Sequence, residues 1–133
     1  MTVKHRDPVK EWFKYAASDF QAAEALFRAK LYQQSIWNCH QALEKHLKGI
    51  LVAQGKVVRK THDLLTLRND TGLAVPEEVQ FFLHDVNAYY QPSRYPDAAL
   101  VSHLAYTRSK TRQLLRLTEL TIKWIRFHSK QKR

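Results

Sequence analysis

The residues best suited to holding an anion lie in the segment 94–97, which reads Arg-Tyr-Pro-Asp. Pro92 and Pro96 stand on either side of Arg94, and each proline restricts the backbone around it. A guanidinium in an ordered loop binds a phosphate or carboxylate through two parallel hydrogen bonds. Asp97 is expected to cap the helix that follows, and a helix N-terminus also attracts anions. The segment therefore predicts a phosphate contact at Arg94.

The same segment also has a purely internal interpretation. Arg94 would then pair with a carboxylate of its own chain, such as Asp19 or Glu44. Tyr95 would pack against the core, and Asp97 would do no more than cap the helix. Both interpretations account for every residue of the segment, so the sequence leaves the choice open.

A second polar group shares one flank of a predicted helix, because its members are spaced three, four and seven residues apart. Its members are Gln41, Glu44, Lys45 and Lys48. Lys45 and Lys48 would add phosphate contacts beside Arg94, with Glu44 in a supporting role. In the alternative, Glu44 and Lys48 form an ordinary ion pair four residues apart on the helix surface.

His62 lies between Thr61 and Asp63, near a predicted helix start. As a general acid or base, His62 would need a partner and a substrate within reach, and the sequence shows neither. A structural role is therefore favoured, in which His62 supports the basic connector before it or the segment 94–97.

The last predicted helix carries a basic stripe. Its members are Arg108, Arg112, Arg116, Lys123 and Arg126. From position 108 onward, nine basic residues stand against one acid, Glu119, so this segment holds +8 of the net charge of +10. Such a stripe can follow the phosphates of RNA or another polyanion, dock an acidic protein, or form a solvated face. All three interpretations stay open.

Apolar residues recur every three or four positions along most of the chain, which is the period of amphipathic helices. Asp7 and Pro8 have the residue types of an N-cap and a first helical position. Helices are expected from Pro8 to a break at 30–31, over 32–54, after a cap at Thr61, over 76–90 and over 98–128. Four long helices and one short one predict an all-α fold, an up-and-down antiparallel helical bundle.

The composition excludes several classes of protein. Three Gly and four Pro among 133 residues are too few for the turns of a β-sandwich, and the length fits a single domain over 1–133. The single cysteine, Cys39, excludes an internal disulfide and is typical of a reducing compartment. No membrane helix or secretory signal is present, so a cytoplasmic location is expected. Neither a metal nor another cofactor is predicted, because the ligand residue types do not cluster.

Apolar residues crowd the end of the last helix and occupy more than one of its faces. They are Leu114, Leu115, Leu117, Leu120, Ile122, Trp124, Ile125 and Phe127. One helix face cannot bury all of them in a small bundle. A partner helix is therefore expected, and a homodimer is the simplest arrangement.

Four blocks of residues resemble the HEPN family (higher eukaryotes and prokaryotes nucleotide-binding domain), in particular its RYPD-containing prokaryotic branch. They are residues 17–20, 40–48, 61–64 and 94–97, in the order in which the family has them. The resemblance implies an up-and-down helical bundle.

The resemblance implies two kinds of function. Some members of the family are metal-independent ribonucleases, often toxins, which use an Arg and a His separated by four to six residues. Others bind nucleotides or partner proteins and are commonly encoded beside a minimal nucleotidyltransferase. None of the seven His residues here has an Arg at the ribonuclease spacing. Whether the protein is an enzyme is therefore left undecided.

The leading hypothesis is a nucleotide or nucleic-acid phosphate-binding module that acts with a nucleotidyltransferase-type partner, as in toxin–antitoxin systems. Arg94 would hold the phosphate, and Asp19 and Asp97 would orient its guanidinium. One alternative is a metal-independent RNA endonuclease in which Arg94 acts with His62 or His103. The other alternative is a purely structural interaction module.

Overall fold

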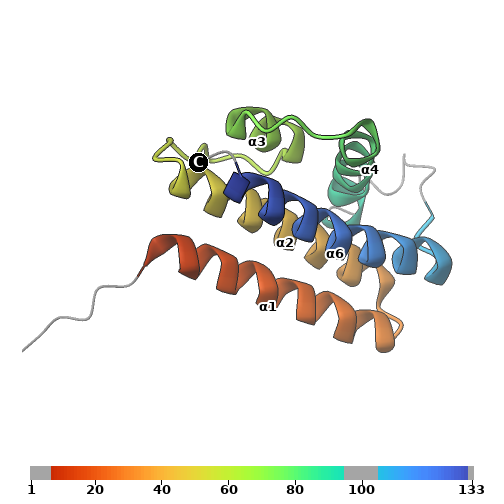
Figure 1. Cartoon of the computed structure of the whole chain (residues 1–133). Coiled ribbons are helices and arrows are strands. Elements are labelled where there is room, and N and C mark those ends of the chain that lie inside the picture. The colour runs from red at the N-terminus through yellow and green to blue at the C-terminus, as the bar shows by residue number, and fades with distance from the viewer. Residues whose placement is uncertain (1–6, 95–104, 132–133) are drawn as a thin grey trace, which may run out of the picture.

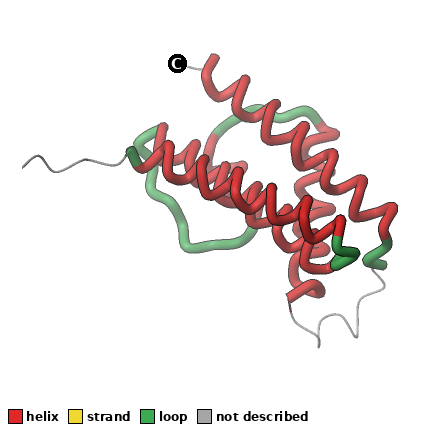
Figure 2. The backbone as a smooth tube through the Cα atoms, turned by 90° about the horizontal axis from the view of Figure 1, so that it is seen from below, coloured by secondary structure: helices red, strands yellow, loops and turns green. Residues whose placement is uncertain are grey.

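The computed structural model describes residues 7–94 and 105–131, with the backbone alone at 91–94 and 131. Five helices account for nearly all of this part of the chain: α1 (Pro8–Arg28), α2 (Tyr32–Ala53), α3 (Leu64–Thr71), α4 (Glu77–Arg94) and α6 (Arg108–Gln131). The longest loop between described neighbours joins α2 to α3 (Figure 2). The prediction of an all-α bundle with four long helices and one short one is confirmed. No described helix is both long enough and apolar enough to cross a lipid bilayer.

Three of the long helices run alongside one another, and α4 crosses them steeply (Figure 1). Helix α1 packs along α2 over most of its length, while α3 and α4 pack on α2 from the other side. Helix α6 runs antiparallel to α1, so the end of α6 lies near the beginning of α1. Helix α2 is thus the central element, covered on both sides.

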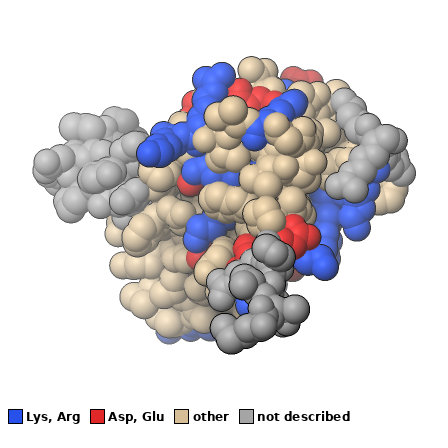
Figure 3. All heavy atoms as spheres, turned by 90° about the vertical axis from the view of Figure 1, so that its left-hand side faces the viewer, with Lys and Arg blue, Asp and Glu red and all other residues tan. Residues whose placement is uncertain are grey.

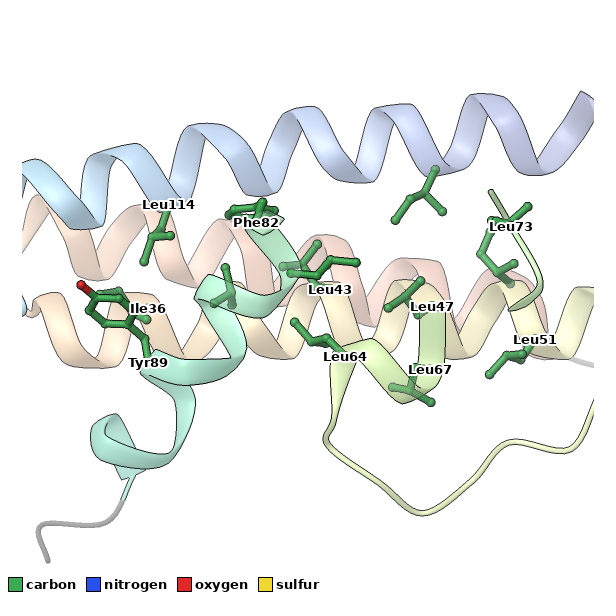
Figure 4. Close-up of a cluster of buried hydrophobic side chains, with 14 residues drawn as sticks. Ile36, Leu43, Leu47, Leu51, Leu64, Leu67, Leu73, Phe82, Tyr89 and Leu114 are labelled. Carbon is green, nitrogen blue, oxygen red and sulfur yellow. The ribbon is translucent and has the colours of Figure 1, made fainter. Parts of the chain in front are cut away.

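The core lies mainly between α2, α3, α4 and α6 (Figure 4). Leucines such as Leu43, Leu47 and Leu67 are fully buried there. Gly49 of α2 allows α1 to approach closely, since a Cβ atom at this position would lie 2.6 Å from Cε1 of Phe13. This close approach fixes the distance between α1 and the centre of the bundle.

The ends of α1 and α2 follow local rules that the sequence displays. The Asp7 carboxylate accepts hydrogen bonds from the backbone N–H groups of Val9, at 2.9 Å, and Lys10, which confirms the predicted cap. Lys30 and Gly55 each follow a helix with positive φ angles of 64° and 70°. At both ends the next N–H bonds back to a carbonyl of the last turn, which satisfies groups that a helix end leaves unpaired.

The last helix begins ten residues later than the expected start at 98. Residues 105–107 are not helical, and α6 starts at Arg108. Thr107 provides the cap, because its Oγ1 accepts a hydrogen bond from the Lys110 N–H at 3.0 Å. The expected role of Asp97 as the cap of this helix is therefore wrong, while Asp97 itself lies outside the described residues.

Two other predicted boundaries also need correction. Helix α3 is capped by Asp63 and not by Thr61, whose hydroxyl instead accepts a hydrogen bond from the Asp63 N–H at 3.1 Å. Helix α4 continues past Tyr90 to Arg94, although Pro92 was expected to stand in a loop. Pro92 has no N–H to bond to the carbonyl four residues earlier, so the last turn of α4 lacks one helical hydrogen bond.

Candidate functional site

A buried carboxylate, Glu44, is the centre of a polar cluster between α2, α4 and the loop before α3. Only 4% of Glu44 is exposed. Its Oε2 atom lies 2.9 Å from Nζ of Lys48, and its Oε1 atom lies 2.9 Å from Nδ1 of His62. A buried carboxylate needs such partners, because an unpaired charge in the interior is strongly unfavourable. Glu44 therefore holds His62 in place from the inside of the bundle.

The His62 side chain itself is 59% exposed. Because its Nδ1 atom donates to Glu44, the neutral ring presents Nε2 as its acceptor. A carboxylate that fixes the tautomer and orientation of an imidazole in this way is a recurring device at functional histidines. The arrangement leaves one ring nitrogen in position to contact a ligand or to move a proton.

Behind His62 lies a second histidine, His40, which is fully buried. Burial lowers the pKa of His40 to about 4, against the opposing effects of its hydrogen bond to Asn87 and the nearby Glu44 charge. Its Nε2 atom lies 3.2 Å from Oδ1 of Asn87, and its ring stacks on Tyr90 with a centroid distance of 3.8 Å. The neutral His40 ring thus supports the wall of the cluster rather than supplying charge.

Asn87 connects this wall to the start of α3. Its Oδ1 atom accepts a hydrogen bond from the Leu64 N–H at 3.1 Å, and its Nδ2 atom donates to Asp63. Burial tends to raise the pKa of Asp63, but hydrogen bonds from Thr66, Asn87 and the backbone outweigh this and lower it. The loop that carries His62 is therefore tied to α4 at both its side chains and its backbone.

These residues surround a polar hollow of about 360 Å³. Its lining consists of Lys60, Thr61, His62, Asp63, Asn87 and Tyr90. The volume lies within the range of small-ligand sites. Arg94 follows Tyr90 by four residues in the same helix, so its Cα lies one turn further along the same face of α4.

Both lysines predicted to contact phosphate hold internal carboxylates. Lys45 forms an ion pair with Asp19 of α1 at 2.6 Å, and it also lies over the ring of Tyr15. Lys48 is buried and forms an ion pair with Glu44. The internal alternative named the Glu44–Lys48 pair, which is buried and not on the surface, but it did not include the Lys45–Asp19 pair. The role of both lysines toward a phosphate stays a prediction.

The structure does not describe the side chains of four predicted site residues. Tyr95, Asp97 and His103 lie outside the described residues, and only the backbone of Arg94 is described. Asp19 and Glu44 were the suggested internal partners of Arg94, and each already holds another cation.

The predicted basic stripe is an exposed face of α6. Arg108, Arg112, Arg116, Lys123 and Arg126 are all exposed. The nearby Glu119 pairs with Lys123 at 3.3 Å. Figure 3 views the end of the bundle where α1 begins and α6 ends, and there basic and acidic side chains are interspersed. The one-sided excess of positive charge is therefore a property of this α6 face.

Reasoning from the sequence missed Asn87, Tyr90 and Lys60. Asn87 carried a signal, because an amide stood among the apolar positions of a predicted helix, next to Val86. A polar side chain on an apolar face is usually held by a specific partner. Tyr90 and Lys60 carried no such signal, since their place at the hollow depends on how α4 crosses α2.

Comparison with known proteins agrees with this architecture. The model of the HEPN domain family matches residues 9–128, which is most of the chain. The chain belongs to the HEPN family. The comparison does not assign it to the RYPD-containing branch. No curated protein matches the chain.

Two solved structures are similar to this HEPN chain. The crystal structure of TT1696 from Thermus thermophilus has 27% sequence identity and a TM-score of 0.81, with coverage of 92% of this chain and 99% of that one. The crystal structure of ST0689, an archaeal HEPN homologue, has 24% identity and a TM-score of 0.73, with coverage of 93% and 99%. The second likeness concerns the fold alone.

Proposed function

We propose that this HEPN protein binds the phosphate group of a nucleotide or nucleic acid in the polar hollow beside His62. The observation that carries the proposal is the Glu44–His62 pair at the rim of the hollow. In its imidazolium form, with the Nδ1 proton held by Glu44, His62 would donate its Nε2–H to the phosphate beside the ammonium of Lys60, and Arg94 would complete the site from the end of α4. Membership of the HEPN family supports the ligand class.

Occupancy of the internal carboxylates also supports a ligand role for Arg94. Lys45 neutralises Asp19, and Lys48 and His62 take the two oxygens of Glu44. A further cation at Asp19 or Glu44 would find no negative charge left to neutralise. A phosphate from outside the chain is the better partner for the Arg94 guanidinium.

The experiment is a titration of the purified protein with ATP, GTP and a short single-stranded RNA. Arg94→Ala and His62→Gln are each expected to weaken the binding of ATP and GTP at least tenfold while the far-ultraviolet circular dichroism stays unchanged. His84→Gln is the matched control, because His84 is exposed on α4 and does not line the hollow. Unchanged affinity in both site variants would refute the assignment.

A metal-independent RNA endonuclease is the second candidate function, and the Glu44–His62 pair favours it specifically. A histidine oriented by a carboxylate is suited to take a proton from a 2′-hydroxyl, and Arg94 would stabilise the charge on the phosphate. The assay is incubation of RNA with the protein in EDTA. Cleavage that is lost in His62→Gln but kept in His84→Gln supports this function. Intact RNA under conditions where the RNA is bound rules it out.

The proposal extends to partners. Genes of HEPN proteins are commonly found beside a gene for a minimal nucleotidyltransferase. This arrangement supports such a partner for this protein, in a toxin–antitoxin-like pair in the cytoplasm. Co-purification of the product of the adjacent reading frame tests this part.

Two apolar residues on the surface of α6, Leu120 and Phe127, support the homodimer, since they are 49% and 58% exposed. Light scattering of Leu120→Ser/Phe127→Ser is expected to report a monomer.

A further inference from the structure

We propose that the groove between α1 and α6 binds single-stranded nucleic acid. The phosphates would follow the basic face of α6, and a base would enter the groove against the phenylalanines of α1. This inference rests on the proposed function for its ligand class, but it concerns a different surface, on the opposite side of α2 from the hollow at His62.

The basic face of α6 is continuous along the helix. Successive helical residues are turned by about 100°, so positions four or seven apart share a face. The members of this face are Arg108, Arg112, Arg116, Lys123, Arg126 and Lys130. All six are exposed, and the face holds one acid, Glu119, which pairs with Lys123. Such a row of cations matches the repeating charge of a phosphate backbone.

This face is turned toward α1 at both of its ends. The Arg108 guanidinium lies 5.5 Å from the ring centre of Phe27, and the Arg126 guanidinium lies 5.9 Å from that of Phe13. Neither arginine forms an ion pair with an acidic residue in the part of the chain that the structure describes. Both guanidinium groups are therefore available to a phosphate.

Helix α1 supplies aromatic rings along the same line. Phe13, Phe20 and Phe27 are seven residues apart, which places them about 10 Å from one another along one side of the helix. Each of the three is only partly buried, although Phe13 stacks on His46 with a centroid distance of 4.7 Å and Phe27 lies beside Arg108. Partly exposed aromatic rings and a row of cations are the two components of sequence-tolerant single-strand binding.

Between the two helices the surface is hollowed to about 370 Å³, which is enough for a nucleotide. The small side chains of Ala16 and Ala17 leave this hollow unfilled, and Phe13 and Phe20 form its walls. His46 of α2 lines the floor, and only 2% of it is exposed. Burial, and then the Arg126 charge, lower the pKa of His46 to about 4, so its ring is neutral.

The side chain of His46 makes the floor of the groove suited to a polar ligand. Its Nε2 atom is buried and has no hydrogen-bond partner among the described residues. Such a group costs free energy when left unpaired. A base offers both a flat apolar surface and donors and acceptors at its edge, and the Glu24 carboxylate at the rim suits an exocyclic amino group.

Single strands fit this groove better than the other polyanions. Bases of a duplex are stacked inside it and cannot reach a pocket without being extruded. An acidic peptide would pair with the α6 cations but would leave the aromatic walls and His46 unused. The combination of cations, aromatic walls and a buried polar atom therefore favours an unpaired base with its phosphates.

The test measures binding of fluorescein-labelled twelve-nucleotide oligo(A), oligo(U) and oligo(dA) by anisotropy at two salt concentrations, with heparin and a polyglutamate peptide as competitors. Arg112→Gln/Arg116→Gln removes two charges from the basic face. Arg59→Gln/Lys110→Gln removes two charges elsewhere and is the matched control, because Arg59 pairs with Asp70 and Lys110 with Asp85. Circular dichroism confirms that all variants are folded.

The variant of the basic face is expected to bind each oligonucleotide at least tenfold more weakly. Its slope of log affinity against log salt should also fall by about 1 to 1.5, because two phosphate contacts are lost. The control pair should change affinity less than threefold. Equal losses in both pairs would overturn the proposal, since they would mean that net charge alone drives binding.

A second pair of variants tests entry of a base. Ala17→Leu fills the groove, and Ala25→Leu adds the same bulk at an exposed position of α1 outside it. Ala17→Leu is expected to weaken oligonucleotide binding at least fivefold and to leave heparin binding unchanged, because heparin has no bases. Equal effects on both ligands, or no effect on either, would overturn base entry.

Two further outcomes would also overturn the inference. One is wild-type protein that binds polyglutamate but no oligonucleotide at low salt, which would identify an acidic protein as the partner. The other is oligonucleotide binding that His62→Gln abolishes and the α6 variant does not, which would place the strand at the hollow. Conversely, failure of ATP binding with intact oligonucleotide binding refutes the proposed site at His62 and leaves this one.

Discussion

Acidification provides a quantitative test of the packing on both sides of α2. His40 and His46 are 0% and 2% exposed, and burial lowers the pKa of each to about 4. In the unfolded chain both imidazoles return to the ordinary pKa of about 6.5. Between these values the unfolded chain binds protons that the folded chain does not. The free energy of unfolding therefore falls as the pH is lowered through this window.

The expected size of the effect follows from the two pKa values. At pH 5 each unfolded imidazole is almost fully protonated, while each folded one is mostly neutral. The loss of stability from pH 7 to pH 5 is thus about 2 kcal/mol for each histidine, or about 4 kcal/mol for the pair. Asp63 does not contribute in this window, because its pKa is lowered from 3.8 and its stabilisation is lost only at more acidic pH.

The assay is urea unfolding at pH 7, 6 and 5, followed by circular dichroism. His46→Leu removes one of the two titrating groups and should roughly halve the loss of stability on acidification. His84→Gln changes an exposed histidine and should leave the loss unchanged. Wild-type protein with the same stability at pH 7 and pH 5 would refute the buried, neutral state of these rings. So would a His46→Leu variant that keeps the full loss.

Three further predictions concern the packing of α1 on α2, the end of α1 and the buried Glu44–Lys48 ion pair. Thermal or urea denaturation checks each of them. Gly49→Ala should destabilise the protein by about 1 to 3 kcal/mol although alanine favours helices, because its Cβ would lie 2.6 Å from Phe13, and an unchanged melting temperature would contradict this close approach. Lys30→Gly should stabilise the protein by about 1 kcal/mol, since the φ angle of 64° is unfavourable for a residue with a side chain. Glu44→Leu should cost about 3 to 5 kcal/mol because it leaves Lys48 buried without its partner. The double variant Glu44→Leu/Lys48→Leu should be more stable than Glu44→Leu alone, and additive losses would show that the pair is not coupled.

The fold was predictable because its signals are local. The spacing of apolar residues indicated the helices, and Asp7 with Pro8 marked the start of α1 correctly. The start of α6 was not predictable in the same way. Asp97 and Thr107 both have the chemistry of a cap, and the choice between them depends on where the helix packs.

The sequence allowed some residues of the candidate site to be predicted, but not the contacts between them. Glu44 and His62 were singled out as supporting residues, and the structure joins them at 2.9 Å. Their pairing depends on the path of the loop before α3, which no spacing rule within a helix describes. Lys45 was expected to face a ligand and instead reaches Asp19 on α1, a contact between helices that spacing within one helix cannot reveal.

The groove between α1 and α6 was the least predictable feature. The spacing of Phe13, Phe20 and Phe27 looks the same whether the rings fill a core or border a groove. The distance between the two helices decides this, and that distance results from packing against α2 at Gly49 and elsewhere. The basic stripe, in contrast, needed only the helical period to be recognised.

The most direct test of the central claim is an NMR titration of protein labelled with ¹⁵N at histidine, with ATP added at pH 7. If phosphate binds in the hollow, the Nε2 resonance of His62 shifts in a saturable manner, its Nδ1 resonance keeps the signature of a proton held toward Glu44, and His84 does not change. In Arg94→Ala the same shift should require at least tenfold more ATP. A His62 resonance that stays in place at saturating ATP would contradict the proposed site.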